Sequence, residues 1–416
     1  MSAVSPSPPP IDRTVAVRSR PAAAWRWARK NLFRSAGDLL VTVVVGGFGL
    51  YVLYRFLRFV FVTGRWDIIR VNLSLFMKGT WPADQLWRLN VAVIGVAALG
   101  GLVAGHLARR QRELDPRPPP PPGRRVLELV GRLWPGLLAL LLLLLLTATA
   151  GPWLLTLGAL VGFVLARLLG SRIPSRSATP VVLIVLLGGL ALVWLLIAGV
   201  PLDSWGGLML NLSLAAVAIT LCFPVGVIMA LGRRSAYPVV RLLCTAYIEL
   251  FRGTPLIALL LMANVAIGFF IPNTLDPGPV LKAIVVLVLF TGAYVAEIVR
   301  GGLQSVPAGQ IEAGRALGLS GLAVTRRIVL PQALRNVIPA LVGQFISLFK
   351  DTTLVGAAMV VTDLLAAAEA STAQTEFRGQ GLIVESLVFV LLIFWAGSYT
   401  MSSESQRFES RLGVGR

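Results

Sequence analysis

Long apolar stretches separated by short polar connections occupy the chain from residue 39 to residue 400. Several are apolar over about 18 residues or more, which is the length that crosses roughly 30 Å of hydrocarbon at about 1.5 Å of rise per residue. We predict ten transmembrane helices, at 39–60, 86–108, 133–150, 153–169, 180–200, 208–231, 242–271, 280–299, 337–359 and 382–400. The predicted fold class is an all-α polytopic membrane protein.

The composition agrees with a bilayer environment. Hydrophobic residues make up 56% of the 416 residues and charged residues 14%, whereas soluble domains carry about 25% charged residues. The formal net charge is +19, and the basic residues gather in connections between apolar stretches, as they do in cytoplasmic loops. No aromatic-interleaved basic fold accompanies them, so we expect the lipid bilayer and no nucleic acid as a partner.

The placement of arginine and lysine predicts the orientation. We expect the arginine-rich connections in the cytoplasm, at 109–132, 170–179 and 232–241. The connection at 272–279 has Asp276 as its single charge and is expected outside. Both termini are then cytoplasmic in a bacterial inner membrane. The connection at 61–85 is an exception, because it is expected outside although it holds Arg65, Arg70 and Lys78.

Residues that bind metals or nucleotides are scarce. The chain has two cysteines, Cys222 and Cys244, and one histidine, His106, all in or beside apolar stretches, where we interpret them as packed side chains. No Gly-rich loop ends in Gly-Lys-Ser or Gly-Lys-Thr, so the chain lacks a phosphate cradle for ATP. We expect no catalytic residue, no metal and no cofactor in this chain.

Composition also divides the chain into regions. Residues 1–38 are rich in Pro, Ser and Arg and are predicted to be a disordered cytoplasmic tail. Pro118 to Pro122 form an unbroken proline run, which is predicted to be a stiff, non-helical spacer. We predict an N-terminal transmembrane extension at 39–204, a transmembrane core at 205–402 and a cytoplasmic tail at 403–416.

The connection at 300–336, which we call the elbow, is predicted to be structured. Ser305 and Pro307 suit the first turn of a helix that continues through Leu317 and ends at Gly318. Ser320 suits the N-cap of a second helix that stops before Pro331. A partner that grips such an elbow can move both flanking spans together. The alternative is an amphipathic helix that lies on the lipid surface.

Seven positions of the elbow form a spaced pattern, and they are Glu312, Ala313, Gly314, Gly318, Ile328, Leu330 and Pro331. In these positions the elbow resembles the EAA loop of ATP-binding-cassette importer permeases. Gly314 departs from the pattern, which has a second alanine there, and glycine weakens a helix by up to about 1 kcal/mol. The resemblance implies a type I permease whose elbow docks in a groove of a separate ATPase subunit, where ATP and Mg²⁺ are bound.

Three further stretches resemble the polar amino acid branch of these permeases, including the general L-amino acid systems. They are 249–256, 293–302 and 349–354. The resemblance covers about half of the chain, and the long N-terminal region resembles the larger of the two permease subunits. It implies import of polar L-amino acids with three partners: an ATPase dimer, a second, homologous permease subunit and a periplasmic amino-acid-binding protein.

Two polar stripes on predicted spans are candidates for the solute pathway. One consists of Gln344, Ser347 and Asp351, and the other of Thr291, Tyr294 and Glu297. Each stripe recurs at helical spacing, so its members share one face. The alternative is that the stripes pack against each other or against the second permease subunit. Gly253 and Pro255 predict a helix break, read either as a simple kink or as a broken helix beside the solute.

Other functions remain as alternatives. A permease for another small polar solute, such as an opine or a cationic amino acid, has the same elbow. A membrane-embedded enzyme needs grouped carboxylates, His or Ser near one interface, whereas the acidic residues here are scattered. An ion channel needs a carbonyl filter or a ring of charges, and no Gly-rich re-entrant segment is evident.

Overall fold

The computed structural model describes residues 32–114, 122–147, 150–174, 179–270, 272 and 276–412. Within these ranges the regular elements are helices, which confirms the all-α prediction, and an isolated β-bridge joins Gly207 and Asp363. Most of the predicted N-terminal tail, Pro118–Pro121 and the end of the C-terminal tail lie outside the described residues. Pro122 is the first residue of a helix, a position that proline tolerates because its missing N–H has no partner there.

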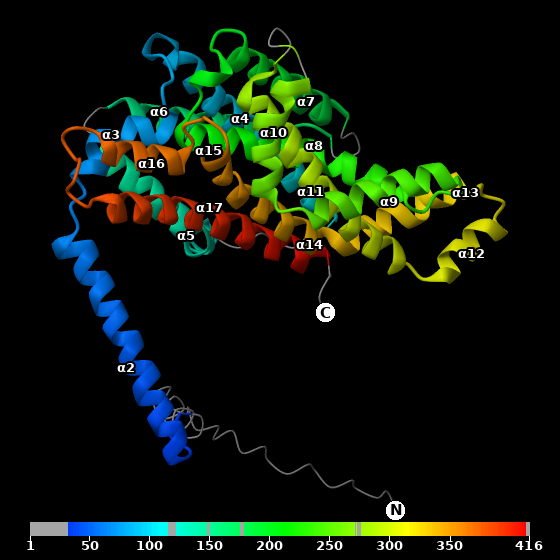
Figure 1. Ribbon diagram of the computed structural model, residues 1–416. Helices are drawn as coiled ribbons and strands as arrows, with labels where there is room; N and C mark the ends of the chain where they lie inside the picture. The colour runs from blue at the N-terminus through cyan, green and yellow to red at the C-terminus, as the bar shows by residue number, and fades with distance from the viewer. Residues whose placement is uncertain are drawn as a thin grey trace, which may run out of the picture. The chain divides into compact units, whose positions relative to one another are not determined.

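Sixteen α-helices make up the described chain (Figure 1). Those before residue 200 are α2 (Ala36–Arg58), α3 (Asp67–Lys78), α4 (Leu86–Leu114), α5 (Pro122–Leu146), α6 (Gly151–Gly170) and α7 (Thr179–Ile197). Those after it are α8 (Gly207–Gly232), α9 (Pro238–Gly253), α10 (Leu256–Phe270), α11 (Gly278–Gln304), α12 (Ala308–Ala316), α13 (Gly321–Val324), α14 (Leu330–Asp351), α15 (Leu354–Ala358), α16 (Leu364–Ala373) and α17 (Ile383–Leu412).

The chain forms two units, of which the first ends at Arg65. In the first unit, the hydroxyl of Ser35 caps α2 by accepting from the N–H of Asp38 at 3.1 Å. None of the described residues of α2 is buried, and its large apolar side chains are exposed on every side. A helix that is apolar all round is suited to contact with lipid.

Seven described segments are long and apolar enough to cross a bilayer. They are Ala36–Thr63, Ala83–Glu113, Gly151–Gly170, Thr179–Ile197, Gly207–Gly232, Gly278–Gln304 and Ile383–Arg407. Each coincides with a predicted span. The pair α9 and α10 meets the same criterion only when the two helices are taken together as one bent span, and their axes differ by 104°.

Two predicted spans differ from the structure. The apolar part of α5 is the shorter segment Leu133–Leu146. The predicted span at 337–359 ends at Asp351, because α14 stops there and α15 begins after two threonines. The hydroxyls of Thr352 and Thr353 donate to the carbonyls of Phe349 and Lys350 at 2.7 and 2.9 Å. Such local bonds compete with continuation of a helix.

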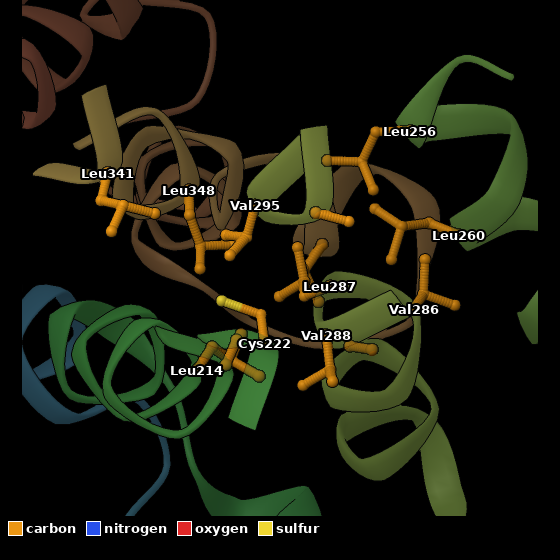
Figure 2. Packing of buried hydrophobic residues seen from close by; sticks show 14 of the residues in the cluster. Leu214, Cys222, Leu256, Leu260, Val286, Leu287, Val288, Val295, Leu341 and Leu348 are labelled. Atoms are coloured by element: carbon orange, nitrogen blue, oxygen red, sulfur yellow. The ribbon is translucent and has the colours of Figure 1, made fainter. Parts of the chain in front are cut away.

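The main core of the second unit surrounds α11, which packs against α8, α9, α10 and α14. Figure 2 shows Leu287 and Val295 of this core among side chains from neighbouring helices. Gly226 lets α8 approach α11 closely, since a Cβ there would lie 2.4 Å from Cγ1 of Val295. Small residues at such crossings bring helix backbones together in membranes.

The predicted connection at 61–85 contains a helix, α3, that the sequence analysis missed. Its apolar face buries Ile68, Ile69 and Phe76 in a second core shared with α16 and α17. Nε2 of Gln374 donates to Oδ1 of Asn72 at 2.6 Å, which ties α3 to the chain beyond α16. The elbow helices α12 and α13 lie at one end of this unit, and α3 and α16 lie at the opposite end (Figure 1).

Candidate functional site

The first arm of the elbow is α12, which ends as the sequence predicts. Gly318 has φ +75°, in the left-handed region that favours glycine. The N–H of Leu319 donates to the carbonyl of Gly314 at 3.2 Å, and the N–H of Gly318 donates to that of Arg315 at 2.9 Å. This pair of bonds is a Schellman motif, which satisfies the last carbonyls of α12 and reverses the chain.

Ser305 has a different role from the predicted one. It is the C-cap of α11, and α12 begins after Pro307. The hydroxyl of Ser305 donates to the carbonyl of Gly302 at 2.9 Å and accepts from Nδ2 of Asn336, also at 2.9 Å. The latter bond joins the end of α11 to the start of α14, so it links the two spans that flank the elbow.

The second arm begins at Ser320 as predicted but does not stop before Pro331. The hydroxyl of Ser320 accepts from the N–H of Ala323 at 3.3 Å. α13 then passes into a π-helical turn at Thr325–Val329, in which the N–H of Leu330 donates to the carbonyl of Thr325, and α14 follows directly. The wider π turn shifts the hydrogen-bond register by one residue, which lets the helical path continue through Pro331.

Gly314, the departure from the EAA pattern, lies where the two arms of the elbow meet. It is buried, and a Cβ on it would lie 2.8 Å from Cδ1 of Ile328 and 3.1 Å from Cγ2 of Val324. Glycine therefore lets α12 pack tightly on the second arm, although it lowers the helix propensity of α12. Val324 and Val329 extend this contact into the main core, so the elbow is anchored to the spans.

The outer surface of the elbow presents both apolar and charged side chains. Leu317 and Leu322, on either side of the turn, are 80% and 79% exposed. Glu312 and Ala313 are exposed on α12. The remaining exposed charged side chains of the two arms are Arg315, Arg326 and Arg327. Apolar side chains that no part of the described chain covers, surrounded by charges, are typical of a protein interface.

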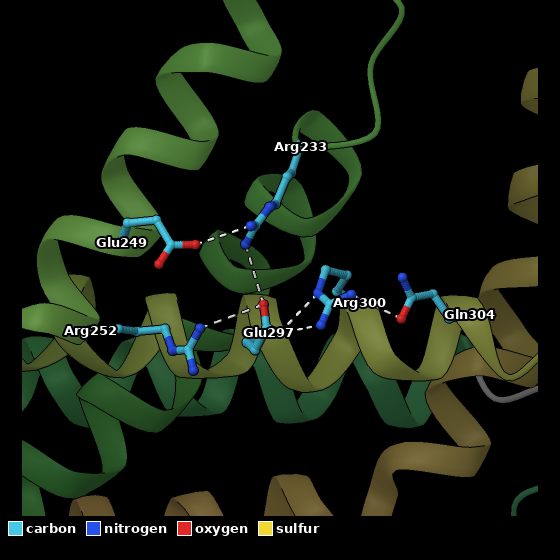
Figure 3. Close-up of polar contacts among 6 residues, drawn as sticks. All are labelled: Arg233, Glu249, Arg252, Glu297, Arg300 and Gln304. Atoms are coloured by element: carbon cyan, nitrogen blue, oxygen red, sulfur yellow. Dashed lines mark hydrogen bonds and ion pairs between the residues drawn. The ribbon is translucent and has the colours of Figure 1, made fainter.

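A second polar group, which we call the arginine cluster, lies at the break between α9 and α10. It consists of Arg233, Glu249, Arg252, Glu297, Arg300 and Gln304 (Figure 3). Arg300 binds one oxygen of Glu297 and, at 2.9 Å, Oε1 of Gln304. Arg233 lies 3.0 Å from Glu249 and 3.4 Å from the other oxygen of Glu297. The cluster joins the end of α8 to α9 and α11.

The structure places the candidate pathway residues of α11 in different surroundings. Thr291 is fully buried, and its hydroxyl has no hydrogen-bond partner. Glu297 belongs to the arginine cluster, and the guanidinium group of Arg252 lies 5.7 Å from the centre of the Tyr294 ring. Tyr294 and Glu297 thus meet at the helix break.

The α14 stripe is less enclosed than Thr291. Gln344, Ser347 and Asp351 are half-buried. α14 packs against α11, but among the described residues no hydrogen bond joins the two stripes.

The break itself follows Arg252. α9 ends at Gly253 and α10 begins at Leu256, with Thr254 and Pro255 between them. The hydroxyl of Thr254 donates to the carbonyl of Leu250 at 2.9 Å, which satisfies one carbonyl at the end of α9. The change of direction of 104° between these helices is a broken helix rather than a kink.

Sequence reasoning missed a third polar group, which we call the polar joint: Asn211, Thr352, Asp363 and Leu364. Nδ2 of Asn211 donates to the hydroxyl of Thr352 at 3.1 Å, and its Oδ1 accepts from the N–H of Leu364 at 2.9 Å. Oδ1 of Asp363 caps α16 by accepting from the N–H of Ala366 at 2.8 Å. Burial raises the pKa of Asp363 to about 6. A buried asparagine in an apolar span was the available signal.

Among the residues that the structure describes, no group of three or more His, Cys, Asp and Glu side chains is arranged to hold a metal ion. Cys222 and Cys244 are buried and unpaired. The site consists of an anchored elbow joined to a bundle of spans. These features define a membrane permease that a partner protein drives.

The chain belongs to the binding-protein-dependent permeases of ATP-binding-cassette transporters. A family profile described as "Binding-protein-dependent transport system inner membrane component" matches residues 222–412. Members of this family are multi-pass transport subunits rather than enzymes, and an ATPase and a binding protein are their general partners.

Named relatives match at high coverage. The inner membrane amino-acid ABC transporter permease YhdY of Escherichia coli K12 is 31% identical over 94% of this chain and 93% of the relative. The glutamate/glutamine/aspartate/asparagine transport system permease BztC of Rhodobacter capsulatus is 33% identical over 83% of this chain and 78% of the relative. The glutamate/aspartate import permease GltK of Escherichia coli is 32% identical over 47% of this chain and 87% of the relative.

Proposed function

We propose that the chain is the permease subunit of an inner-membrane importer that moves polar L-amino acids into the cytoplasm. The observation that supports this proposal most directly is the elbow, with its anchored arms and its uncovered leucines at the turn. The named relatives YhdY, BztC and GltK support the amino acid class. Opines and cationic amino acids are the competing solutes.

The proposed assembly has four kinds of component. An ATPase dimer binds the elbow through Glu312, Ala313, Gly318 and their neighbours, and a second, homologous permease subunit completes the membrane pore. A periplasmic amino-acid-binding protein delivers the solute. Residues 205–402 form the permease core and 39–204 an extension, and both termini lie in the cytoplasm.

The proposed solute pathway runs between α11 and α14. The half-buried amide and hydroxyl of Gln344 and Ser347 replace part of the hydration shell of an amino acid, and Thr291, Tyr294, Glu297 and Asp351 complete the lining. Substitution of Gln344 and Ser347 by alanine is expected to change which amino acids are taken up. Unaltered uptake and selectivity in that double variant contradict this part of the proposal.

The test of function is ATP-dependent uptake of labelled amino acids into proteoliposomes that contain the complete assembly. Wild type is expected to import polar amino acids, and Glu312→Lys is expected to abolish uptake while the complex still inserts, because it reverses an exposed charge on α12. Glu376→Lys is the matched control, since Glu376 is an exposed carboxylate beyond α16 and outside the elbow. Uptake that is indifferent to ATP and to Glu312 contradicts the proposal.

A further inference from the structure

We propose that Arg252, at the break between α9 and α10, binds the α-carboxylate of the transported amino acid. This inference rests on the proposed function and adds a specificity-determining residue to it. Arg252 belongs to neither of the polar stripes that the sequence indicated, yet it is the cation with the weakest protein contacts in the arginine cluster.

The contacts of Arg252 are long and incomplete. Its Nη1 lies 3.7 Å from Oε2 of Glu297, which is beyond ordinary hydrogen-bond length. The same oxygen lies 3.4 Å from Nη1 of Arg233, and the other oxygen of Glu297 is bound by Arg300. Glu297 is therefore already occupied by two stronger partners, and Arg252 is held only loosely.

The hydrogen-bonding capacity of Arg252 exceeds what the described chain supplies. Its Nε is buried and has no hydrogen-bond partner. A buried donor without a partner is rare in native structures and calls for a functional or structural explanation. A guanidinium group presents its N–H donors as a planar fork that matches the two oxygens of a carboxylate. The Nε edge of Arg252 is thus an unpaired half of such a fork.

Charge at the break also favours an anion. Three guanidinium groups face two carboxylates in the cluster, which leaves one positive charge in excess. α10 begins four residues after Arg252, so the positive end of its dipole lies at the same break. The ring of Tyr294 lies beside the guanidinium group, in a cation–π contact.

The accessibility of Arg252 suits exchange between two partners. Its side chain is 34% exposed, against 25% for Glu297, so it is neither sealed in the core nor free in solvent. In this conformation Arg252 points toward Glu297 (Figure 3). On arrival of the solute, it leaves Glu297 and turns its fork to the α-carboxylate, which every L-amino acid carries.

The experiment measures binding of tritiated L-glutamine to the detergent-solubilised complex of both permease subunits and the ATPase, without the binding protein. L-glutamine and its α-amide compete for the site. Wild type is expected to prefer the free acid by about tenfold or more, since a charge-assisted pair is lost with the amide. Arg252→Gln is expected to remove this preference, and Arg252→Lys to keep part of it because the charge remains.

Two further variants separate recognition from packing. Glu297→Gln removes the carboxylate that competes with the solute for Arg252 and is expected to raise the affinity for the free acid. Arg252→Gln is expected to lower that affinity. If Arg252 only holds α9 against α11, both substitutions break the same contact and shift affinity in the same direction, which overturns the inference. Arg300→Gln is expected to keep the preference, because Arg300 already has Glu297 and Gln304 as partners.

The outcomes also separate this inference from the proposed function. A wild-type assembly that imports and binds L-glutamine, with an Arg252→Gln variant that still prefers the free acid, overturns the role of Arg252 alone. A wild-type assembly that imports no polar L-amino acid overturns the proposed function and, with it, this inference.

Discussion

The elbow and the polar joint both join helices of the second unit, but the elbow exposes apolar side chains, whereas the polar joint buries polar ones. The elbow leaves Leu317 and Leu322 about four-fifths exposed at its turn. The polar joint fully buries the side chains of Asn211 and Asp363 and satisfies them internally. Exposed apolar side chains prepare a surface for a partner, whereas buried polar networks fix one internal geometry. We therefore expect substitutions in the elbow to impair coupling and substitutions in the joint to impair stability.

The largest expected effect on stability is at Asn211. Asn211→Leu keeps the size of the side chain but leaves the N–H of Leu364 without a partner and removes the contact at 3.5 Å with Oδ2 of Asp363, whose Oδ1 still caps α16. We expect a loss of about 2–4 kcal/mol, the usual cost of unpaired buried polar groups. Thermal unfolding of the purified complex, followed by tryptophan fluorescence, measures it. An unchanged unfolding temperature contradicts the structural role of the joint.

The matched substitution in the elbow is expected to behave in the opposite way. Leu317→Ala removes an exposed side chain, so the free energy of unfolding should change by no more than about 0.5 kcal/mol. ATP-driven uptake is expected to fall severalfold, because an apolar anchor for the ATPase is lost. A variant with full uptake but reduced stability would reverse the comparison.

The joint is also expected to make stability depend on pH. Burial raises the pKa of Asp363 from 3.8 to about 6, so the folded protein favours the protonated carboxyl. The stabilisation that Asp363 contributes is complete below the pKa of this group in the unfolded chain, and it is lost as pH rises through about 6. Acidification from about pH 7.5 to about pH 5.5 should stabilise the wild type by roughly 1 kcal/mol through this group. Asp363→Asn cannot titrate there, and a pH response equal to that of wild type contradicts the prediction.

The smallest expected effect is at Gly314. Gly314→Ala gains up to about 1 kcal/mol of helix propensity but brings a methyl group against Cδ1 of Ile328. We expect the two terms to nearly cancel. In the Ile328→Val background, which lacks Cδ1, the same substitution should stabilise the complex. A double-mutant cycle by thermal unfolding measures this coupling, and strictly additive effects would show that the two residues do not interact.

Local signals accounted for the parts of the fold that the sequence predicted. Span positions follow from hydrophobic length, and Gly318 and Ser320 follow from helix-capping preferences. The end of α14 at Asp351 was missed because threonine hydroxyls bond to carbonyls within an apolar stretch, where hydropathy gives no warning. α3 was missed because its apolar face is short, although Ile68, Ile69 and Phe76 recur at helical spacing.

Contacts between distant residues were beyond the reach of sequence patterns. Asn211 and Asp363 are separated by 152 residues, and Arg233 and Glu297 by 64. The sequence placed Glu297 on a polar stripe but did not indicate that Arg233, Arg252 and Arg300 surround it. Likewise, Gly314 looked like a weakness of the helix until its contact with Ile328 was visible.

Thiol cross-linking from the turn of the elbow tests the central claim most directly. Cys222 and Cys244 are buried, so a single substitution Leu317→Cys provides the reactive surface thiol. In the assembled transporter we expect this variant to cross-link to the ATPase subunit and Glu376→Cys, placed beyond α16, to give no such product. Equal cross-linking from both positions, or none from Leu317→Cys in an assembly that still imports amino acids, would show that the elbow is not where ATP hydrolysis is coupled to transport.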